Sequence, residues 1–146
     1  MEVVPGLQRK MRDARCSWER SVEVLRWAKQ AGASITKSSI MVGCGEAEDE
    51  VYDAMARLRE AEVDVLTLGQ YLRPSKKHAE VVRFVPPAEF DRYRERGMAL
   101  GFRYVASGPL VRSSYRAAEA FLKGVLKGQG SFDDRYGKKT RLAVVR

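Results

Sequence analysis

Three short runs rich in apolar and β-branched residues alternate with longer segments of helical periodicity along this chain. The runs cover 35–42, 63–71 and 102–106, and a glycine stands at or just beyond the end of each. Parallel neighbouring strands need a crossover of about the length found between these runs. The alternation therefore predicts an α/β fold of about three parallel strands alternating with helices, as a small open sheet or as part of a barrel.

The expected helices have recognisable ends. Ser17 precedes a helix that stops at Gly32, and the acidic segment 46–50 forms the first turn of a second helix. Pro86 and Pro87 open a third helix, which ends at Gly101. Each expected strand is thus separated from the next by one helix.

Polar residues and glycines gather where the three strands are expected to end. In folds of this class ligands bind at the C-terminal ends of the strands, so these residues should meet on one edge of the sheet. They are Gly43, Cys44, Gly45 and Glu46 after the first strand, Gln70, Tyr71 and Arg73 after the second, and Ser107, Arg112, Ser113 and Ser114 after the third.

Several of these residues allow two interpretations. Gly43 and Gly45 would let a nucleotide-like ligand approach the backbone, or they form a simple strand-to-helix turn. A lysine such as Lys37 is costly to bury unpaired in an apolar run, so it should reach the edge or pair with a carboxylate. Ser113 and Ser114 follow Arg112 at a helix mouth, which favours an anion, and either hydroxyl could be an N-cap, a proton donor or a metal ligand.

The cysteines and the single histidine indicate little chemistry by themselves. Cys16 and Cys44 fit no C-x-x-C spacing, which favours a reducing compartment. Cys44, between two glycines, is expected to be exposed, but one thiol without a partner is usually inert and we do not assign it as a ligand. His78 is either a surface loop residue or a residue that positions substrate.

The positive charge is concentrated at the C-terminal end. Lysine and arginine exceed aspartate and glutamate by 27 to 19, and five of the eight net charges lie in 123–146. No basic face interleaved with aromatic residues accompanies them, so nucleic acid is an unlikely partner. No apolar run approaches the about 20 residues that span a membrane. We expect residues 1–127 to form the domain and 128–146 a basic, loosely ordered tail.

Three segments, 37–46, 66–75 and 106–115, together resemble motifs of lipoyl synthase, a radical S-adenosylmethionine enzyme, and they occur in the same order. The resemblance covers about residues 4–127 and is restricted to the C-terminal half of that family. It implies that residues 1–127 form the C-terminal part of a radical S-adenosylmethionine (β/α) barrel.

The resemblance also implies an activity. Lipoyl synthases insert two sulfur atoms, at C6 and C8, into an octanoyl group carried by lipoyl domains, namely the glycine cleavage H protein and the E2 subunits of 2-oxoacid dehydrogenases. One 4Fe–4S cluster, held by a Cys-x3-Cys-x2-Cys motif, cleaves S-adenosylmethionine to a radical. A second, auxiliary 4Fe–4S cluster is the sulfur source and is held by three cysteines and a serine of an Arg-Ser-Ser-Tyr motif.

That motif is Arg112 to Tyr115 in this chain. By resemblance Ser114 is the expected iron ligand and a catalytic residue, and Arg112 is a second catalytic residue beside the cluster. The expected cofactor-binding residues are Lys37, Gly43, Gly45 and Glu46, as part of the S-adenosylmethionine wall, and Gln70 and Arg73 at the following strand end.

The chain departs from the family in having neither cysteine motif. We therefore expect it to be inactive alone and to require an N-terminal half, as a gene fragment, a split gene product or an incomplete sequence. The alternative is a non-catalytic module that binds acidic lipoyl carrier domains or the intact enzyme. The exposed edge of a partial barrel also predicts self-association.

The expected location follows from the same resemblance. It is the mitochondrion or plastid in a eukaryote and the cytoplasm in a bacterium. We find no targeting segment within this sequence.

Overall fold

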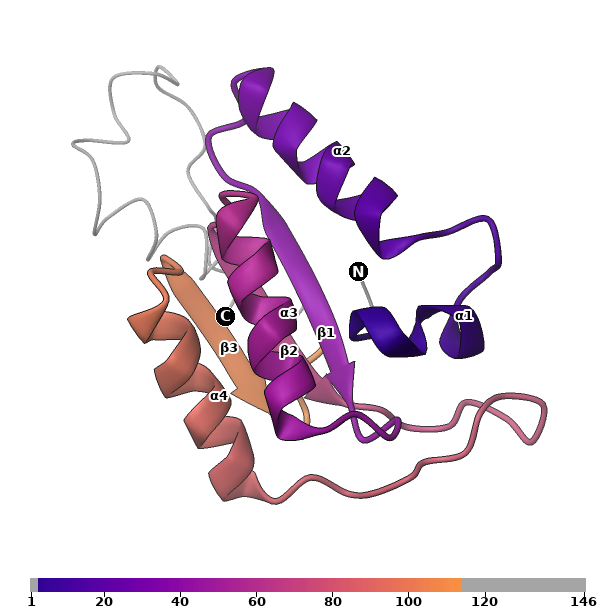
Figure 1. The fold of residues 1–146 in the computed structure, drawn as a ribbon. Helices are drawn as coiled ribbons and strands as arrows, with labels where there is room; N and C mark the ends of the chain where they lie inside the picture. The colour runs from indigo at the N-terminus through magenta and orange to yellow at the C-terminus, as the bar shows by residue number, and fades with distance from the viewer. Residues whose placement is uncertain (1–2, 114–146) are drawn as a thin grey trace, which may run out of the picture.

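The structure, a computed structural model, describes residues 3–113 and consists of a parallel sheet with helices alternating along the chain (Figure 1). After a short 3-10 turn, Pro5–Leu7, the elements are α1 (Gln8–Met11), α2 (Trp18–Gln30), β1 (Lys37–Val42), α3 (Glu48–Glu60), β2 (Val65–Gln70), α4 (Pro87–Ala99) and β3 (Tyr104–Gly108). The three strands are parallel in the order β1-β2-β3. The α/β prediction is confirmed, and within the described part of the chain the sheet is open rather than closed.

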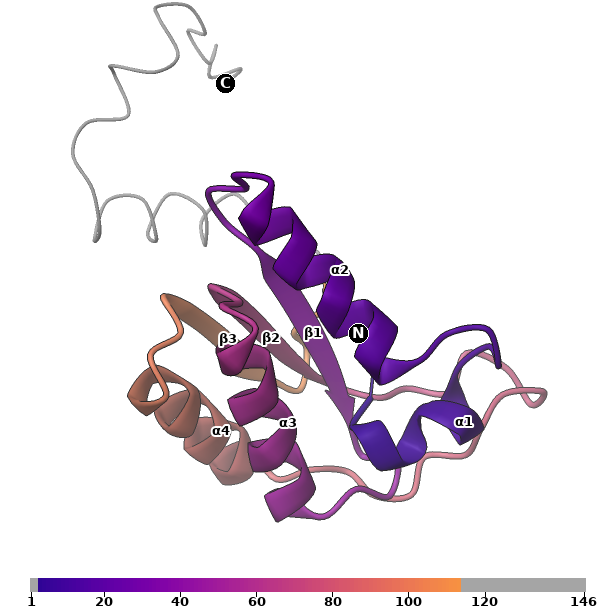
Figure 2. The ribbon, with the colours of Figure 1, turned by 45° about the horizontal axis from the view of Figure 1, so that its top comes forward.

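Helices α3 and α4 cover one face of the sheet, and α2 runs along its β1 side (Figures 1 and 2). The core lies between the sheet and these helices. Gly97 lets α4 pack closely against β3 and α3, since an added Cβ would lie 2.8 Å from a methyl group of Val105 and 3.0 Å from Met55. The largest fully buried core side chains are Trp18, Tyr93, Phe90, Ile40, Met55, Leu58, Leu66 and Leu68.

Most element ends agree with the sequence, and the differences have local causes. Ser17 caps α2 by accepting a hydrogen bond from the Arg20 N–H at 3.1 Å. The acidic first turn of the second expected helix starts later than predicted, because Glu46 folds back onto the backbone before α3 begins at Glu48. Strand β3 extends to Gly108 and stops at Pro109, which cannot donate a hydrogen bond to the sheet.

Asp64 connects the N-terminal ends of all three strands. Its carboxylate accepts a hydrogen bond from the Thr36 N–H, just before β1, at 2.8 Å and is 2.5 Å from the Lys29 ammonium at the end of α2. The Arg103 guanidinium, just before β3, lies 3.2 Å from the same carboxylate, and the Asp64 backbone carbonyl accepts from the Arg103 N–H at 2.8 Å. Asp64 is 4% exposed, so one buried carboxylate is satisfied from three directions.

We predict that Asp64→Asn lowers the free energy of unfolding by about 2–4 kcal/mol, because it removes the buried anion shared by the mostly buried Lys29 and the half-exposed Arg103. Urea denaturation of the chain measures the change. The matched control is Asp91→Asn, whose partner Arg94 is on the helix surface, and its effect should be within about 0.5 kcal/mol. Equal effects of the two substitutions would contradict the role of Asp64.

Candidate functional site

A cavity of about 660 Å³ lies on the face of the sheet that α3 and α4 do not cover. Ser39 and Met41 of β1, and Thr67 and Gly69 of β2, line it, whereas the residues between them along each strand pack into the core. The N-terminal segment 10–12, the long connection between β2 and α4, and Val111 to Ser113 complete its lining. Parts of the three resembling segments therefore meet around one cavity.

The lining of this cavity is positively charged. It includes Lys10, Arg12, Lys77 and Arg112, and none of the described residues that line it is an aspartate or a glutamate. Such a lining favours a ligand with an anionic group.

Thr67 adds an unused polar group to the wall of the cavity. It is 2% exposed, and its hydroxyl oxygen has no hydrogen-bond partner among the described residues. A buried hydroxyl of this kind is normally paired, so a ligand in the cavity would be a suitable partner.

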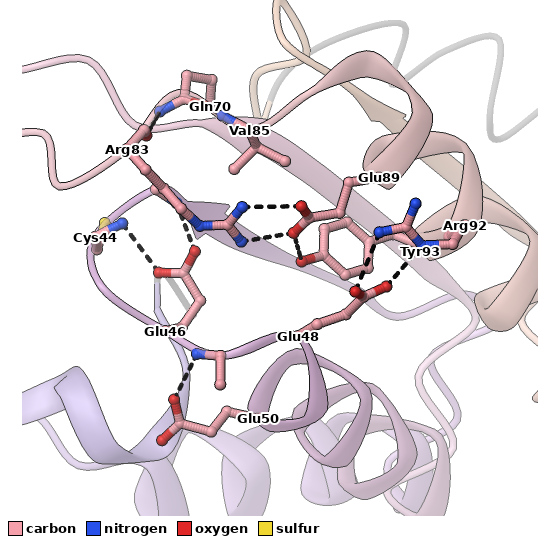
Figure 3. A network of polar contacts seen from close by, with 12 residues as sticks. Cys44, Glu46, Glu48, Glu50, Gln70, Arg83, Val85, Glu89, Arg92 and Tyr93 are labelled. Atoms are coloured by element: carbon pink, nitrogen blue, oxygen red, sulfur yellow. Dashed lines mark hydrogen bonds and ion pairs between the residues drawn. The ribbon is translucent and has the colours of Figure 1, made fainter.

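The turn after β1 is held by its own residues. The Glu46 carboxylate accepts hydrogen bonds from the N–H groups of Gly43 at 2.5 Å and Cys44 at 2.9 Å, and Glu46 is buried (Figure 3). Gly43 has φ of +93°, and an added Cβ would lie 2.3 Å from the Gln70 amide nitrogen. The glycine is thus required by the protein's own packing, as in the strand-to-helix-turn interpretation.

Gln70 fixes the return of the long connection between β2 and α4. Its amide nitrogen donates to the carbonyls of Tyr71 at 3.0 Å and Arg83 at 3.1 Å, and its amide oxygen accepts from the Val85 N–H at 2.9 Å. Through these contacts the buried amide holds both ends of segment 71–85 in place. Part of this segment lines the cavity.

Arg73 stabilises the far part of the same connection. Its guanidinium donates to the carbonyls of His78 at 2.9 Å and Lys76 at 2.5 Å, and it pairs with Glu80 at 3.2 Å. His78 lies on the surface of this loop, where its ring nitrogen Nδ1 is 2.9 Å from the Ser75 hydroxyl, and it also lines the cavity. His78 is therefore both an exposed loop residue and part of the cavity lining.

Lys37 is far from the turn that contains Gly43, because it begins β1 and Gly43 follows the end of that strand. Its ammonium donates to the Ser113 carbonyl, and burial lowers its pKa. The sequence had suggested that Lys37 reaches the C-terminal edge or pairs with a carboxylate. Among residues 3–113 it does neither. Arg112 donates to the carbonyls of Val111 at 2.8 Å and Pro109 at 3.3 Å and lines the cavity.

The structure therefore separates the predicted site residues into groups. Gly43, Gly45, Glu46 and Gln70 lie together at the C-terminal edge, Arg73 stays in its loop, and Lys37 meets the Arg112 segment through Ser113. Ser114 and the expected tail, 128–146, lie outside the described residues.

Two ion-pair networks next to this edge were not predicted from the sequence. Arg83 donates to both oxygens of Glu89 at 2.8 and 2.6 Å, and Tyr93 donates to the same carboxylate (Figure 3). Glu89 has a lowered pKa, chiefly because of Arg83. Arg83 and Glu89 flank Pro86 and Pro87 in the chain, and no spacing rule marks them as partners.

The second network joins α3 to α4. Arg92 donates to both oxygens of Glu48 at 2.8 and 3.1 Å, and the Tyr52 hydroxyl donates to one of them at 2.5 Å. The hydrogen bond from Arg92, followed by that from Tyr52, lowers the pKa of Glu48 to about 2.

The described residues do not by themselves form a metal site. No group of three or more histidine, cysteine, aspartate or glutamate side chains between 3 and 113 is placed to hold a metal ion. Cys44 is 1% exposed, contrary to our expectation, and burial raises the pKa of its thiol to about 12. Residues 3–113 therefore do not fit an iron–sulfur cluster unaided. None of the described helices is long and apolar enough to cross a membrane.

We predict that Glu48→Gln destabilises the chain at neutral pH and that this difference disappears in acid. Because the folded-state pKa of Glu48 is lowered, its stabilisation is present above about pH 4.5 and is lost as the pH falls toward about 2. Denaturation of both proteins between pH 7 and 2 measures this. Glu95→Gln, on an exposed part of α4, is the control, and a difference for Glu48→Gln that does not change with pH would contradict the prediction.

The family of this chain is identified by its similarity to known proteins. No family model matches it. The chain is 56% identical over 127 residues to the mitochondrial lipoyl synthase of Ostreococcus lucimarinus, a match that covers 87% of this chain and 32% of that protein. It is 53% identical over 129 residues to the mitochondrial lipoyl synthase of Coprinopsis cinerea, covering 88% and 33%.

A third relative is the apicoplast lipoyl synthase of Plasmodium knowlesi, 48% identical over 141 residues, with 96% of this chain and 30% of that protein covered. The chain thus spans about a third of the length of these relatives, less than the half suggested by its motifs. The mitochondrial and apicoplast names of the relatives agree with the organelle location expected for a eukaryotic protein. At this similarity the chain belongs to the lipoyl synthase family and corresponds to the C-terminal part of those enzymes.

Proposed function

We propose that this chain supplies one wall of the active site of a lipoyl synthase, and that it works only with the remaining part of such an enzyme. The observation that carries the proposal is the meeting of segments 37–46, 66–75 and 106–113 around one cavity, in a chain about half identical to lipoyl synthases. The reaction is sulfur insertion into octanoyl groups on lipoyl carrier domains.

The 4Fe–4S clusters of the proposed enzyme need ligands from outside residues 3–113, because the described residues do not form a metal site. Ser114 is proposed as one iron ligand on the resemblance alone. S-adenosylmethionine, when bound, would supply the radical chemistry of the family.

The chain's own residues would shape and charge the cavity. Glu46 and Gln70, which were expected to bind cofactor, have their described hydrogen bonds to backbone groups, so we assign them to holding the wall in place. Thr67 and Arg112 both belong to the lining of the space available to a ligand.

A binding module without catalysis is the second candidate. The basic residues of the cavity lining support it, because lysine and arginine attract an acidic protein surface. Binding of this type would weaken with increasing salt and would occur without any N-terminal half.

We predict lipoyl formation only when this chain is combined with the cysteine-containing N-terminal part of a lipoyl synthase. After anaerobic cluster reconstitution, mass spectrometry of an octanoylated carrier domain should show the gain of two sulfur atoms. The chain alone should give none. Failure of the combined proteins to form product, together with salt-sensitive binding of the carrier domain by this chain alone, would favour the binding module instead.

In the same assay Arg112→Ala should lower product formation about ten- to hundredfold, as expected for the loss of a charged hydrogen-bonding group at the site. Arg94→Ala is the matched control, since Arg94 pairs with Asp91 on the surface of α4. Equal activity of the two variants would remove Arg112 from the site.

We further predict that Ser114→Ala reduces the iron and sulfide bound by the combined proteins, because a methyl group cannot ligate iron. Ser113→Ala provides a neighbouring control, as the described hydrogen bond of Ser113 uses its backbone carbonyl. Iron and sulfide quantification after reconstitution measures the effect. Unchanged binding in Ser114→Ala would show that this serine is not a ligand.

A further inference from the structure

Gly69 lies directly beneath the segment that follows β3. A Cβ added at Gly69 would be 2.1 Å from the carbonyl oxygen of Val111 and 3.1 Å from its carbonyl carbon, and the next nearest atom belongs to Arg112 at 3.7 Å. A backbone atom cannot move aside as the end of a side chain can. Any side chain at position 69 would therefore lift Val111 and Arg112 away from the sheet.

The local conformation of β2 does not explain this glycine. Gly69 is paired within the strand, opposite Met41 on one side and Gly108 on the other, and its φ is not in the left-handed region. Glycine in a strand interior weakens the strand and often marks a close approach of another backbone. Here the backbone that approaches is that of Val111.

The segment that rests on Gly69 is a compact turn. The Val111 N–H donates to the Gly108 carbonyl at 3.1 Å, and the Arg112 guanidinium donates to the carbonyls of Val111 at 2.8 Å and Pro109 at 3.3 Å. The turn therefore moves as a unit, and contact at Val111 sets the place of Arg112 in the cavity lining.

Lys37 provides a second attachment, from the β1 edge of the same sheet face. It begins β1, the strand farthest from β3, and its ammonium donates to the carbonyl of Ser113. The carbonyl of Ser113 and the nitrogen of Ser114 belong to one rigid, planar peptide unit. A hydrogen bond to that oxygen therefore restrains the orientation of the chain at Ser113.

We propose that Gly69 and Lys37 are positioning residues that hold Val111, Arg112 and Ser113 against the cavity face of the sheet. Gly69 admits the Val111 carbonyl, and Lys37 holds the carbonyl of Ser113. Lys37 thus acts through the backbone of Ser113 rather than by contact with cofactor. The catalytic consequence of these two contacts rests on the proposed function. The contacts themselves do not depend on it.

The first test uses the chain as it is and needs no cofactor. Trypsin cleaves after Arg112 only when the turn opens, and mass spectrometry can follow the fragments that end at Arg112. Gly69→Ala and Lys37→Met should each raise this cleavage rate about tenfold, since one close packing contact or one charged hydrogen bond is removed from a local opening equilibrium. Lys37→Arg should restore much of the protection.

Matched controls separate this effect from general destabilisation. Gly108→Ala adds a Cβ in the same turn, but its nearest neighbour would be a methyl group of Val111 at 3.5 Å, an ordinary contact. Gly97→Ala crowds the core at Val105 and Met55 and adds no contact with the turn itself. Cleavage at Arg112 should not change in Gly108→Ala and should follow only global stability in Gly97→Ala. Unchanged cleavage in both Gly69→Ala and Lys37→Met would overturn the inference.

The second test measures iron and sulfide in the combined, reconstituted proteins. Gly69→Ala and Lys37→Met should lose bound iron as Ser114→Ala does, although these two variants keep the Ser114 hydroxyl. Faster tryptic cleavage at Arg112 with unchanged bound iron and product would overturn the role of Gly69 and Lys37 in positioning the cluster ligand. It would leave their contacts with residues 111–113 supported. Absence of product from the unmodified combination would instead count against the proposed function, and the cleavage result would stand independently.

Discussion

The arrangement of the three strands depends most on the contacts of Asp64, which join the N-terminal ends of these strands. A single buried carboxylate receives the Thr36 N–H, the Lys29 ammonium and the Arg103 guanidinium, and these groups come from the segments that lead into β1 and β3 and from the end of α2. A buried carboxylate is stable only when it is fully paired. The need to satisfy it brings the N-terminal ends of the strands together and so places their C-terminal ends along one edge.

At that C-terminal edge, polar residues mostly stabilise the protein's own backbone. Glu46 closes the turn after β1, Gln70 clamps the connection after β2, and Arg83 with Glu89 ties the end of this connection to α4. These contacts hold the edge in place. The adjoining cavity is formed by the sheet face that α3 and α4 leave uncovered, together with the N-terminal segment and the turn after β3. Rigid support of this kind is what a site requires if its reacting groups are to be held in place.

The family assignment and the cavity are consistent with each other, and several motif residues support the backbone around the cavity. Lys37, Glu46 and Gln70 belong to the motifs that carry the resemblance, yet their described contacts are to backbone atoms of this chain. Motif residues of an enzyme can thus be important for the position of neighbouring groups without touching a ligand. In this chain the close approach at Gly69 shows the same principle, because its role is to leave room for Val111.

The sequence is sufficient to predict the alternation of helices and strands, the parallel sheet, the family, and the position of Gly43, Gly45, Glu46 and Gln70 at the C-terminal edge. These follow from periodicity, caps and glycine positions, which act over a few residues, and from the similarity of its motifs. Tertiary structure alone decided that Cys44 is buried, that Lys37 meets Ser113 across the sheet, and that Asp64 and the Arg83–Glu89 pair are central. Those contacts join residues whose spacing in the chain carries no signal, because packing and charge pairing depend on distance in space.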